Sequence, residues 1–419
     1  MARLVMKFGG TSVGDIERMR HAAGHVKREF DAGHEVAVVV SAMAGETDRL
    51  AELARQAAPM HDAREYDSIL ATGEQVSAGL LSIVLQSIGI PARSWTGWQI
   101  PVQTTQMHGG ARIQGIQTKV LEQRLATRSV CVICGFQGIS DDNRITTLGR
   151  GGSDTSAVAI AAALNADCCD IYTDVDGVYT TDPRIVPRAQ KLDKVSYEEM
   201  LEMASSGAKV LQARSVELAK VHGVRLRVRS TFQAPDAHVS DVPKFDAGIG
   251  TLVCDEDEIV EQQVVSGIAY AKDEAKVTLV KLADKPGVAA GVFGPLADGG
   301  INVDMIVQNV SEDGQHTDLT FTVPQSQLER ALEILREVRD EIDFRELSGS
   351  TDIVKISVIG VGMRSHAGVA AQMFRCLAEK GINIQAITTS DIKVSILIDA
   401  AYAELAIRAL HTAFGLDSD

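Results

Sequence analysis

Short apolar runs rich in valine and isoleucine alternate with segments of helical periodicity over the first 250 residues. The apolar runs are Leu4–Phe8, Glu35–Val40, Ser129–Gly135, Cys169–Thr173 and Val224–Val228, and the helical segments are Ile16–Phe30, Glu74–Ile88, Ser156–Leu164, Tyr197–Ser205 and Val210–His222. Nearly continuous apolar strands between helices are typical of a mainly parallel sheet that helices cover on both faces. Residues 1–250 are therefore predicted to form a three-layer αβα domain.

The pattern changes after the acidic run Asp255–Glu258, which is interpreted as a solvated linker. Residues 287–306 and 368–387 match at 11 of 20 positions, without a gap and at an offset of 81. A match of that density indicates two copies of one structural unit.

Each copy is predicted to fold as strand, helix, strand, strand, helix, and Phe344–Leu347 adds a closing strand to the first copy. This βαββαβ order is ferredoxin-like and predicts two such domains, at 263–348 and 349–419. The second copy lacks its closing strand, and an open sheet edge is a pairing liability. We expect a strand from about residues 262–268, centred on Gln263–Ile268, to fill that edge.

Composition and charge exclude several classes of protein. The net charge of −15 disfavours binding to nucleic acid, because the chain offers no basic patch for phosphates. The chain contains no run of 18 apolar residues and no signal peptide, so we expect no membrane span and a cytoplasmic protein. Cys131 and Cys134 form a CxxC within an apolar run and are interpreted as part of a buried strand. No second ligand pair follows at zinc-site spacing, so no metal site is predicted.

The most informative stretch is Gly149–Thr155, which leads into a predicted buried helix. Glycines let the backbone approach a ligand, and a helix start offers N–H groups to an anion. Arg150 adds a planar fork that suits a carboxylate or a phosphate. The alternative is a plain turn whose helix is capped by Ser153 or Thr155.

Further polar residues are expected at the same edge of the predicted sheet. Lys7 lies in the first strand, just before two glycines, and could place an ammonium on a transferring phosphate. Ser41 ends the second strand, and Thr47 offers a hydroxyl nearby. Glu74, near a helix start, could either satisfy the helix dipole or hold a cationic group of a substrate. The residues alone leave these two roles for Glu74 equally open.

A loop with three aspartates follows the strand that ends at Thr173. An EF-hand is excluded by the wrong glycine and glutamate spacing, and the loop is interpreted as the edge of a nucleotide site. Tyr179 offers a flat face, Arg184 a phosphate contact, and Lys209 could reach the same site. The chain has no GxxxxGK[ST] and no HRD or DFG, so it is neither a P-loop protein nor a protein kinase.

Together, the motifs KFGGTS at Lys7–Ser12, GRGGSD at Gly149–Asp154 and TDVDGVYTTDP at Thr173–Pro183 resemble those of the aspartokinases, in the amino-acid kinase family. The resemblance covers essentially the whole chain, and the repeats resemble a tandem pair of ACT domains. It implies phosphorylation of the side-chain carboxylate of L-aspartate by ATP with Mg²⁺, giving 4-phospho-L-aspartate. That reaction is the first step toward lysine, threonine and methionine.

The resemblance also implies roles for individual residues. Lys7 and Asp154 would be catalytic, with Lys7 on the transferred phosphoryl group and Asp154 orienting Lys7. The aspartate-binding residues would be Thr47, Glu74, Arg150, Gly151, Gly152 and Ser153, and the ATP-binding residues Lys7, Phe8, Gly9, Gly10, Ser41, Thr173, Asp174, Tyr179, Arg184 and Lys209.

The ACT pair implies feedback inhibition by lysine, threonine or both. Effectors would bind at Asp284, Gly287, Val288, Ala289, Asn302 and Gln308 in the first copy and at His366, Ala367, Val369, Asn383 and Ile384 in the second. Any one of these residues could instead merely build a turn. The resemblance further implies a homo-oligomer, or a heterotetramer with a shorter ACT-only subunit that begins near Val260.

Two rival functions remain at this stage. One is a related small-molecule kinase that acts on glutamate, acetylglutamate, carbamate or a nucleotide, against which the ACT pair and the GRGGSD form argue. The other is an amino-acid sensor without catalysis, against which the presence of Lys7, Glu74, Arg150 and Asp154 argues.

Overall fold

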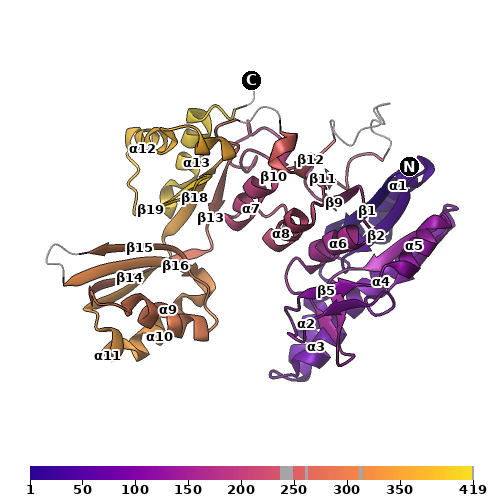
Figure 1. The fold of residues 1–419 in the computed structure, drawn as a ribbon, viewed down its shortest axis with the longest axis horizontal. Helices are drawn as coiled ribbons and strands as arrows, with labels where there is room; N and C mark the ends of the chain where they lie inside the picture. The colour runs from indigo at the N-terminus through magenta and orange to yellow at the C-terminus, as the bar shows by residue number, and fades with distance from the viewer. Residues whose placement is uncertain (236–248, 260–262, 311–314, 418–419) are drawn as a thin grey trace. The chain divides into compact units, whose positions relative to one another are not determined.

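The computed structural model describes residues 1–235, 249–259, 263–310 and 315–417 (Figure 1). The chain divides into two compact units. The first comprises Met1–Val178, Lys191–Ala204 and Lys209–Val260, and the second comprises Tyr179–Gln190, Ser205–Ala208 and Glu261–Asp419.

The first unit is built on an eight-stranded sheet with the order β10-β12-β11-β9-β1-β2-β6-β3. Among its described strands only β11 and β12 pair antiparallel; all other neighbours are parallel. The strands are β1 (Arg3–Phe8), β2 (Glu35–Val40), β3 (Ala92–Trp95), β6 (Val130–Cys134), β9 (Cys168–Thr173), β10 (Lys194–Ser196), β11 (Leu226–Ser230) and β12 (Thr251–Cys254). The mainly parallel sheet predicted from the apolar runs is confirmed. Cys131 and Cys134 lie on β6, all of whose residues are buried.

Helices cover both faces of this sheet. Met6 and Phe8 of β1 point into a core shared with α1 and α4. Because successive strand residues face opposite sides, Lys7 faces the other layer, where α6 packs on β1 and β9. The helices of the unit are α1 (Ile16–Asp31), α2 (Glu46–Ala57), α3 (Ala63–Leu70), α4 (Thr72–Ser87), α5 (Lys119–Ala126), α6 (Gly152–Ala163), α7 (Tyr197–Ser205) and α8 (Ala213–His222). The three-layer αβα prediction therefore holds.

A small second sheet in the first unit has the order β5-β4-β7-β8 and was not predicted. Its strands are β4 (Val102–Thr104), β5 (Ile113–Ile116), β7 (Gln137–Ser140) and β8 (Ile145–Thr147). Strands of three or four residues, rich in threonine and glutamine, carry too short an apolar pattern to be recognised. The sheet matters for function because β8 leads directly into Gly149 and Arg150.

The stretch Ala63–Ser87, which contains α3 and α4, is long and apolar enough to cross a membrane by length and composition alone. More than half of its most apolar window is buried inside the fold. Ala78, Leu81 and Leu85 of α4 belong to the core under the large sheet. Burial of this kind is what a core helix requires, so the stretch is weak evidence for a membrane span.

The second unit contains two ferredoxin-like domains, each with helices packed on one face of a four-stranded sheet (Figure 1). The first comprises β14 (Glu274–Ala283), α9 (Val288–Asp298), β15 (Asp304–Val310), β16 (His316–Pro324), α10 (Leu328–Glu337), α11 (Arg339–Ile342) and β17 (Glu346–Ser350). The second comprises β13 (Gly267–Ala271), β18 (Ile353–Ile359), α12 (Val369–Glu379), β19 (Ala386–Thr389), β20 (Lys393–Asp399) and α13 (Ala403–Ala413). The order in the first sheet is β15-β16-β14-β17 and in the second β13-β18-β20-β19.

The strand beside β18 comes from the segment that precedes the first repeat. β13 pairs antiparallel with β18 from Gly267↔Ile359 to Ala271↔Lys355. It occupies the open edge considered above, but its strand begins at Gly267, so only the last two residues of Gln263–Ile268 take part. Residue 262 of the expected range lies outside the described residues.

The two ferredoxin-like domains are joined by a buried ion cluster. Lys355 on β18 is only 3% exposed, and its Nζ lies 3.0 Å from Glu274 Oε1 and 2.5 Å from Asp304 Oδ2. Met305 and Ile353 belong to an apolar cluster at the same junction. Charge and apolar contacts therefore hold β14 and β15 against β18.

The boundaries of the units differ from the predicted ones in three places, one of which is the short segment Ser205–Ala208 in the second unit. β12 (Thr251–Cys254) is a strand of the large sheet, so the first unit runs past residue 250. Tyr179–Gln190 belongs to the second unit, where Ile185 and Val186 enter the core around β18 and α13. An extended loop with few apolar residues offers no sequence pattern that assigns it to a distant core.

Candidate active site

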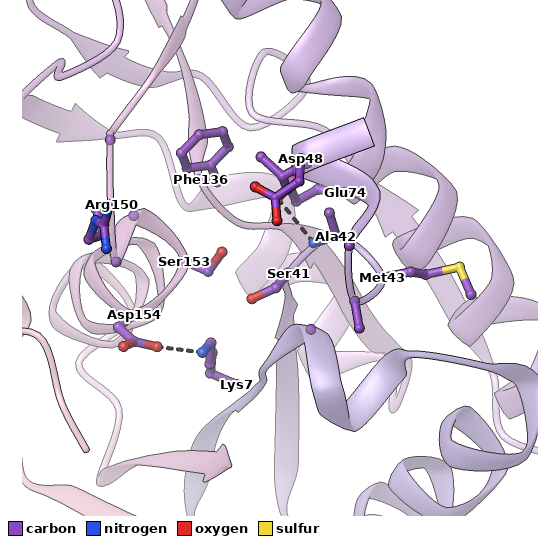
Figure 2. Close-up of a pocket in the computed structure, with 17 residues that line it drawn as sticks. Lys7, Ser41, Ala42, Met43, Asp48, Glu74, Phe136, Arg150, Ser153 and Asp154 are labelled. Atoms are coloured by element: carbon purple, nitrogen blue, oxygen red, sulfur yellow. Dashed lines mark hydrogen bonds and ion pairs between the residues drawn. The ribbon is translucent and has the colours of Figure 1, made fainter. Parts of the chain in front are cut away.

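Four neighbouring strands bring functional residues to one edge of the large sheet. β1, β2, β6 and β9 are adjacent and parallel, so their carboxyl ends meet there. In open α/β sheets ligands bind at this edge. A cavity of about 350 Å³ opens beside it, shown in Figure 2. The lining residues include Lys7, Gly10, Ser41, Thr47, Glu74, Arg150, Gly151, Gly152, Ser153 and Asp154, all of which were singled out from the sequence.

Lys7 and Asp154 form an ion pair on one side of this cavity. Lys7 Nζ lies 2.5 Å from Asp154 Oδ1, and both side chains are nearly buried (Figure 2). Lys7 comes from β1, and Asp154 from the first turn of α6. A carboxylate at this distance fixes the ammonium in one position. A cation that stabilises a transferring group needs such a fixed position.

Helix α6 begins at the ligand-facing wall without a side-chain cap. Its N-cap is Gly151, in the left-handed region at φ 70°, so neither Ser153 nor Thr155 is the cap. Ser153 lies inside the first turn and lines the cavity. Because no side chain of the described residues caps this end of the helix, its N–H groups and dipole favour an anion there.

Arg150 stands between two glycines whose backbone conformations other residues rarely adopt. Gly149 has φ 77° and Gly151 has φ 70°. A Cβ on Gly149 would lie 2.9 Å from Gly109 O, and one on Gly151 only 2.1 Å from Gln212 Cγ. Within the described residues, the guanidinium of Arg150 makes no hydrogen bond or ion pair, so it is available to a ligand carboxylate.

Glu74 sits on the opposite wall, in the first turn of α4, and is only 3% exposed. Its Oε1 accepts the N–H of Ala42 at 3.0 Å, whereas its buried Oε2 has no partner among the described residues. Burial raises the pKa of Glu74 to about 7. A buried carboxyl with a spare oxygen in a cavity wall fits an ammonium ligand better than simple neutralisation of a helix dipole.

Six further lining residues were not singled out from the sequence: Ala42, Met43, Ala44, Gly45, Asp48 and Phe136. Phe136 has φ 67°, and its N–H is held by Ser156 Oγ at 3.0 Å. It follows β6 and Gly135 directly, so its place after a buried strand was the signal that could have found it. Its ring gives the cavity one apolar wall among charged ones.

The glycine loop after β1 is less open to phosphate than its sequence suggests. Gly9 donates its N–H to Tyr172 O at 3.2 Å, and a Cβ on Gly10 would lie 2.9 Å from Ala42 O. The side chain of Phe8 is fully buried and stacked on Tyr172 at 4.8 Å between ring centres. Any contact of Phe8 with a nucleotide is therefore limited to its backbone.

The other expected ATP-binding residues do not line this cavity. Thr173 and Asp174 lie at the carboxyl end of β9, with Thr173 Oγ1 donating to Asp174 Oδ1 at 3.1 Å. Lys209 is exposed in the turn after α7. Tyr179 and Arg184 belong to the second unit, where Arg184 forms an ion pair with Asp182 at 2.8 Å. Their contact with a nucleotide stays a prediction.

In the second unit, the two repeats place glycines alike. Gly287 and Gly368 are the N-caps of α9 and α12, with φ 94° and 106°. His366, Ala367 and Val369 line a cavity of about 860 Å³ at the start of α12. The side chains of Val288 and Val369 are buried in the domain cores, so packing accounts for much of their role. Asp284, Ala289, Asn302, Gln308 and Asn383 are exposed, and Ile384 is half-buried.

Comparison with known proteins decides the family. Residues 2–230 match the amino acid kinase family, and residues 276–340 and 356–414 each match the ACT domain. The aspartokinase of Pseudomonas aeruginosa is 53% identical over 420 residues, covering 100% of this chain and 98% of that protein. The chain belongs to the aspartokinases of the amino acid kinase family.

Solved aspartokinases share the fold. Escherichia coli aspartokinase III in complex with aspartate and ADP (R-state) matches with a TM-score of 0.79 at 27% identity, covering 98% of this chain and 99% of that one. The same enzyme in complex with lysine and aspartate (T-state) matches with a TM-score of 0.76 at 27% identity and the same coverage. The family resemblance carried by KFGGTS and GRGGSD is therefore confirmed, and the chain is an aspartate kinase with ACT regulatory domains.

Proposed function

We propose that this chain transfers the γ-phosphoryl group of ATP to the side-chain carboxylate of L-aspartate, giving 4-phospho-L-aspartate. The observation that carries the proposal is the single cavity in which the Lys7–Asp154 pair faces Arg150 and Glu74. Escherichia coli aspartokinase III, which has the same fold, was solved with aspartate and ADP.

Different residues of the cavity wall would bind different groups of aspartate. Arg150 would grip the α-carboxylate of aspartate, and Glu74 its ammonium, with Thr47, Ser153 and the glycines completing the wall. These contacts leave the side-chain carboxylate free to attack. A carboxylate is already a nucleophile, so no strong general base is needed, and positioning with charge neutralisation supplies the rate.

Lys7 would neutralise charge on the transferred phosphoryl group while Asp154 holds its ammonium in place. Mg²⁺ would be carried by the phosphates of ATP, where it neutralises their charge. The described residues contain no cluster of three histidine, cysteine, aspartate or glutamate side chains suited to a metal, and phosphate-borne Mg²⁺ needs few protein ligands. Thr173, Asp174, Tyr179, Arg184 and Lys209 remain the proposed nucleotide side.

The reaction would be the first step of lysine, threonine and methionine synthesis in the cytoplasm, with lysine, threonine or both inhibiting through the ACT pair. Escherichia coli aspartokinase III was also solved with lysine. Inhibition requires that the effector bind an inactive state more tightly. The eleven effector-binding residues named from the resemblance, with Asn302, Gln308 and His366 among them, remain the proposed contacts.

A homo-oligomer, or a heterotetramer with a shorter ACT-only subunit, is part of this proposal. Val260, where such a subunit would begin, lies outside the described residues. A product starting there would lack Ile185 and Val186, which pack into the second ACT core. Mass spectrometry of native protein tests whether it exists.

A trap for acyl phosphates tests the proposed function. The purified full-length chain is incubated with ATP, Mg²⁺, hydroxylamine and one acid in each reaction: L-aspartate, L-glutamate or N-acetylglutamate. We expect hydroxamate with aspartate alone, and less of it when lysine and threonine are added. Hydroxamate with glutamate but not aspartate would indicate the related kinase, and turnover with none of the acids would indicate the sensor.

A further inference from the structure

A fully buried carboxylate lies outside the cavity, on α3. Asp67 Oδ2 accepts the His108 Nδ1–H at 2.8 Å and the Thr147 N–H at 3.0 Å, and Oδ1 accepts the Thr147 hydroxyl at 2.6 Å. The Gly109 N–H reaches both oxygens, at 3.1 and 3.2 Å. Among the described residues no lysine or arginine pairs with Asp67. A buried carboxylate is retained at such a place only because these donors satisfy it.

The donors come from two segments that are distant in sequence. His108 and Gly109 lie in the loop between β4 and β5, and Thr147 is the last residue of β8. Asp67 thus joins α3, that loop and the end of β8 in one hydrogen-bonded node. Thr147 stands three residues before Arg150.

The same loop is packed against the turn that carries Arg150. The N–H of Ala111 donates to Thr147 O at 2.9 Å, and Gly109 O lies so close to Gly149 that a Cβ there would be 2.9 Å away. Arg214 closes the other side by donating to Leu148 O at 2.8 Å and Ala111 O at 2.7 Å. The backbone that enters Arg150 is therefore held on both sides, although the side chain of Arg150 itself is free.

We propose that Asp67 is a positioning residue that sets the Arg150 turn for binding of the aspartate α-carboxylate. This rests on the proposed function of Arg150. Asp67 does not line the cavity, so it acts only through the backbone of Thr147–Gly149. A bidentate guanidinium contact requires placement within about half an ångström, and a misplacement of about 1 Å costs about 100-fold.

The test uses the full-length chain with Asp67→Asn. The amide keeps the shape of the side chain but turns an NH₂ toward donors that need an acceptor, which disturbs the node. We expect the KM for aspartate to rise about 10- to 100-fold while the KM for ATP changes less than about twofold. Glu65→Gln is the matched control, because this α3 carboxylate is largely exposed and pairs only with Arg144 in the described structure.

A gentler pair of variants keeps the test valid if Asp67→Asn does not fold, as judged by circular dichroism. Thr147→Val removes one hydroxyl from the node and is expected to raise the KM for aspartate about 3- to 10-fold, in the range of a single lost hydrogen bond. Thr147→Ser restores the hydroxyl and is expected to restore the KM. A merely structural role predicts lower thermal stability with no separation between the two KM values.

A double-mutant comparison separates this proposal from the function on which it rests. In an Arg150→Ala background, aspartate binding measured by calorimetry should change little when Asp67→Asn is added. Both variants remove the same interaction, the contact of Arg150 with the α-carboxylate of aspartate. Equal effects of Asp67→Asn with and without Arg150 would overturn the proposal. If Arg150→Ala leaves aspartate binding unchanged, Arg150 does not bind aspartate and the role of Asp67 is disproved with it. If the wild type turns over no aspartate, the proposed function itself is wrong.

Discussion

In the proposed binding mode the carboxylate of Glu74 holds the ammonium of aspartate, and this makes aspartate binding depend on pH in a direction that the structure specifies. Burial raises the pKa of its carboxyl from an ordinary 4.5 to about 7. That rise corresponds to roughly 3 kcal/mol in favour of the neutral form. In that binding mode, the ammonium of aspartate needs the ionised form of Glu74. At pH 6 only about a tenth of Glu74 is ionised, so the KM for aspartate is expected to be about tenfold higher than at pH 8.

Glu74→Gln is the perturbation that isolates this effect. The amide keeps an oxygen for the Ala42 N–H, now held at 3.0 Å, and removes only the charge. Loss of a hydrogen bond to a charged group costs about 1.5–3 kcal/mol, so the KM for aspartate at pH 8 should rise roughly 10- to 150-fold. The pH dependence below 7 should disappear with it.

The assay follows ADP release at saturating ATP from pH 5.5 to 8.5, with Glu52→Gln as a control for an exposed carboxylate on α2 that pairs with Arg55. A flat KM for aspartate across this range in the wild type, or a wild-type pH profile in the Gln variant, would rule out Glu74 as the titrating group. Because the folded-state pKa is raised, the contribution of Glu74 to stability is present below pH 4.5 and is lost as the pH rises through about 7. Urea unfolding of the two proteins at pH 8 should therefore find Glu74→Gln the more stable.

Three further predictions concern other parts of the molecule. Lys7→Ala should lower kcat by about 10²-fold or more while circular dichroism stays unchanged; near-normal kcat would remove Lys7 from the chemistry. Gly151→Ala forces a Cβ against Gln212 at 2.1 Å and should raise the KM for aspartate by about tenfold or more, whereas Gly223→Ala, with a positive φ but open space, should not. Lys355→Met leaves two carboxylates without their buried cation, and because the Asp304 side chain is half exposed it should destabilise the ACT pair by about 1–2 kcal/mol; an unchanged calorimetric transition would count against a structural role for that cluster.

The elements that the sequence predicts well are those with a long, uniform pattern. Glu35–Val40 and Tyr197–Ser205 occur with the predicted bounds, and the first helix differs by one residue at Asp31. Their apolar periodicity is local, so it survives without knowledge of the fold. The repeat was equally plain, because identical positions at one offset need no structural context.

The features that escaped prediction depend on contacts between distant residues. The small β5-β4-β7-β8 sheet has strands too short to show a period. Phe136 is placed by a left-handed backbone conformation that its sequence does not indicate. Asp67 looks like an ordinary helix-surface acid until His108 and Thr147 are brought to it across about 40 and 80 residues. Ile185 joins a core that is built mainly from residues between Val354 and Leu416. Such tertiary placements are decided by packing and not by local propensity.

The central claim is that an oxygen of the aspartate side chain attacks the γ-phosphorus of ATP. Aspartate labelled with ¹⁸O in its side-chain carboxylate is turned over by the purified chain, and the acyl phosphate is trapped with hydroxylamine. Hydroxylamine attacks the acyl carbon, so the released phosphate keeps the bridging oxygen. Direct attack by the aspartate oxygen predicts phosphate that carries one ¹⁸O, formed only with ATP and lost in Lys7→Ala. Phosphate without ¹⁸O would mean that water, and not aspartate, is the nucleophile.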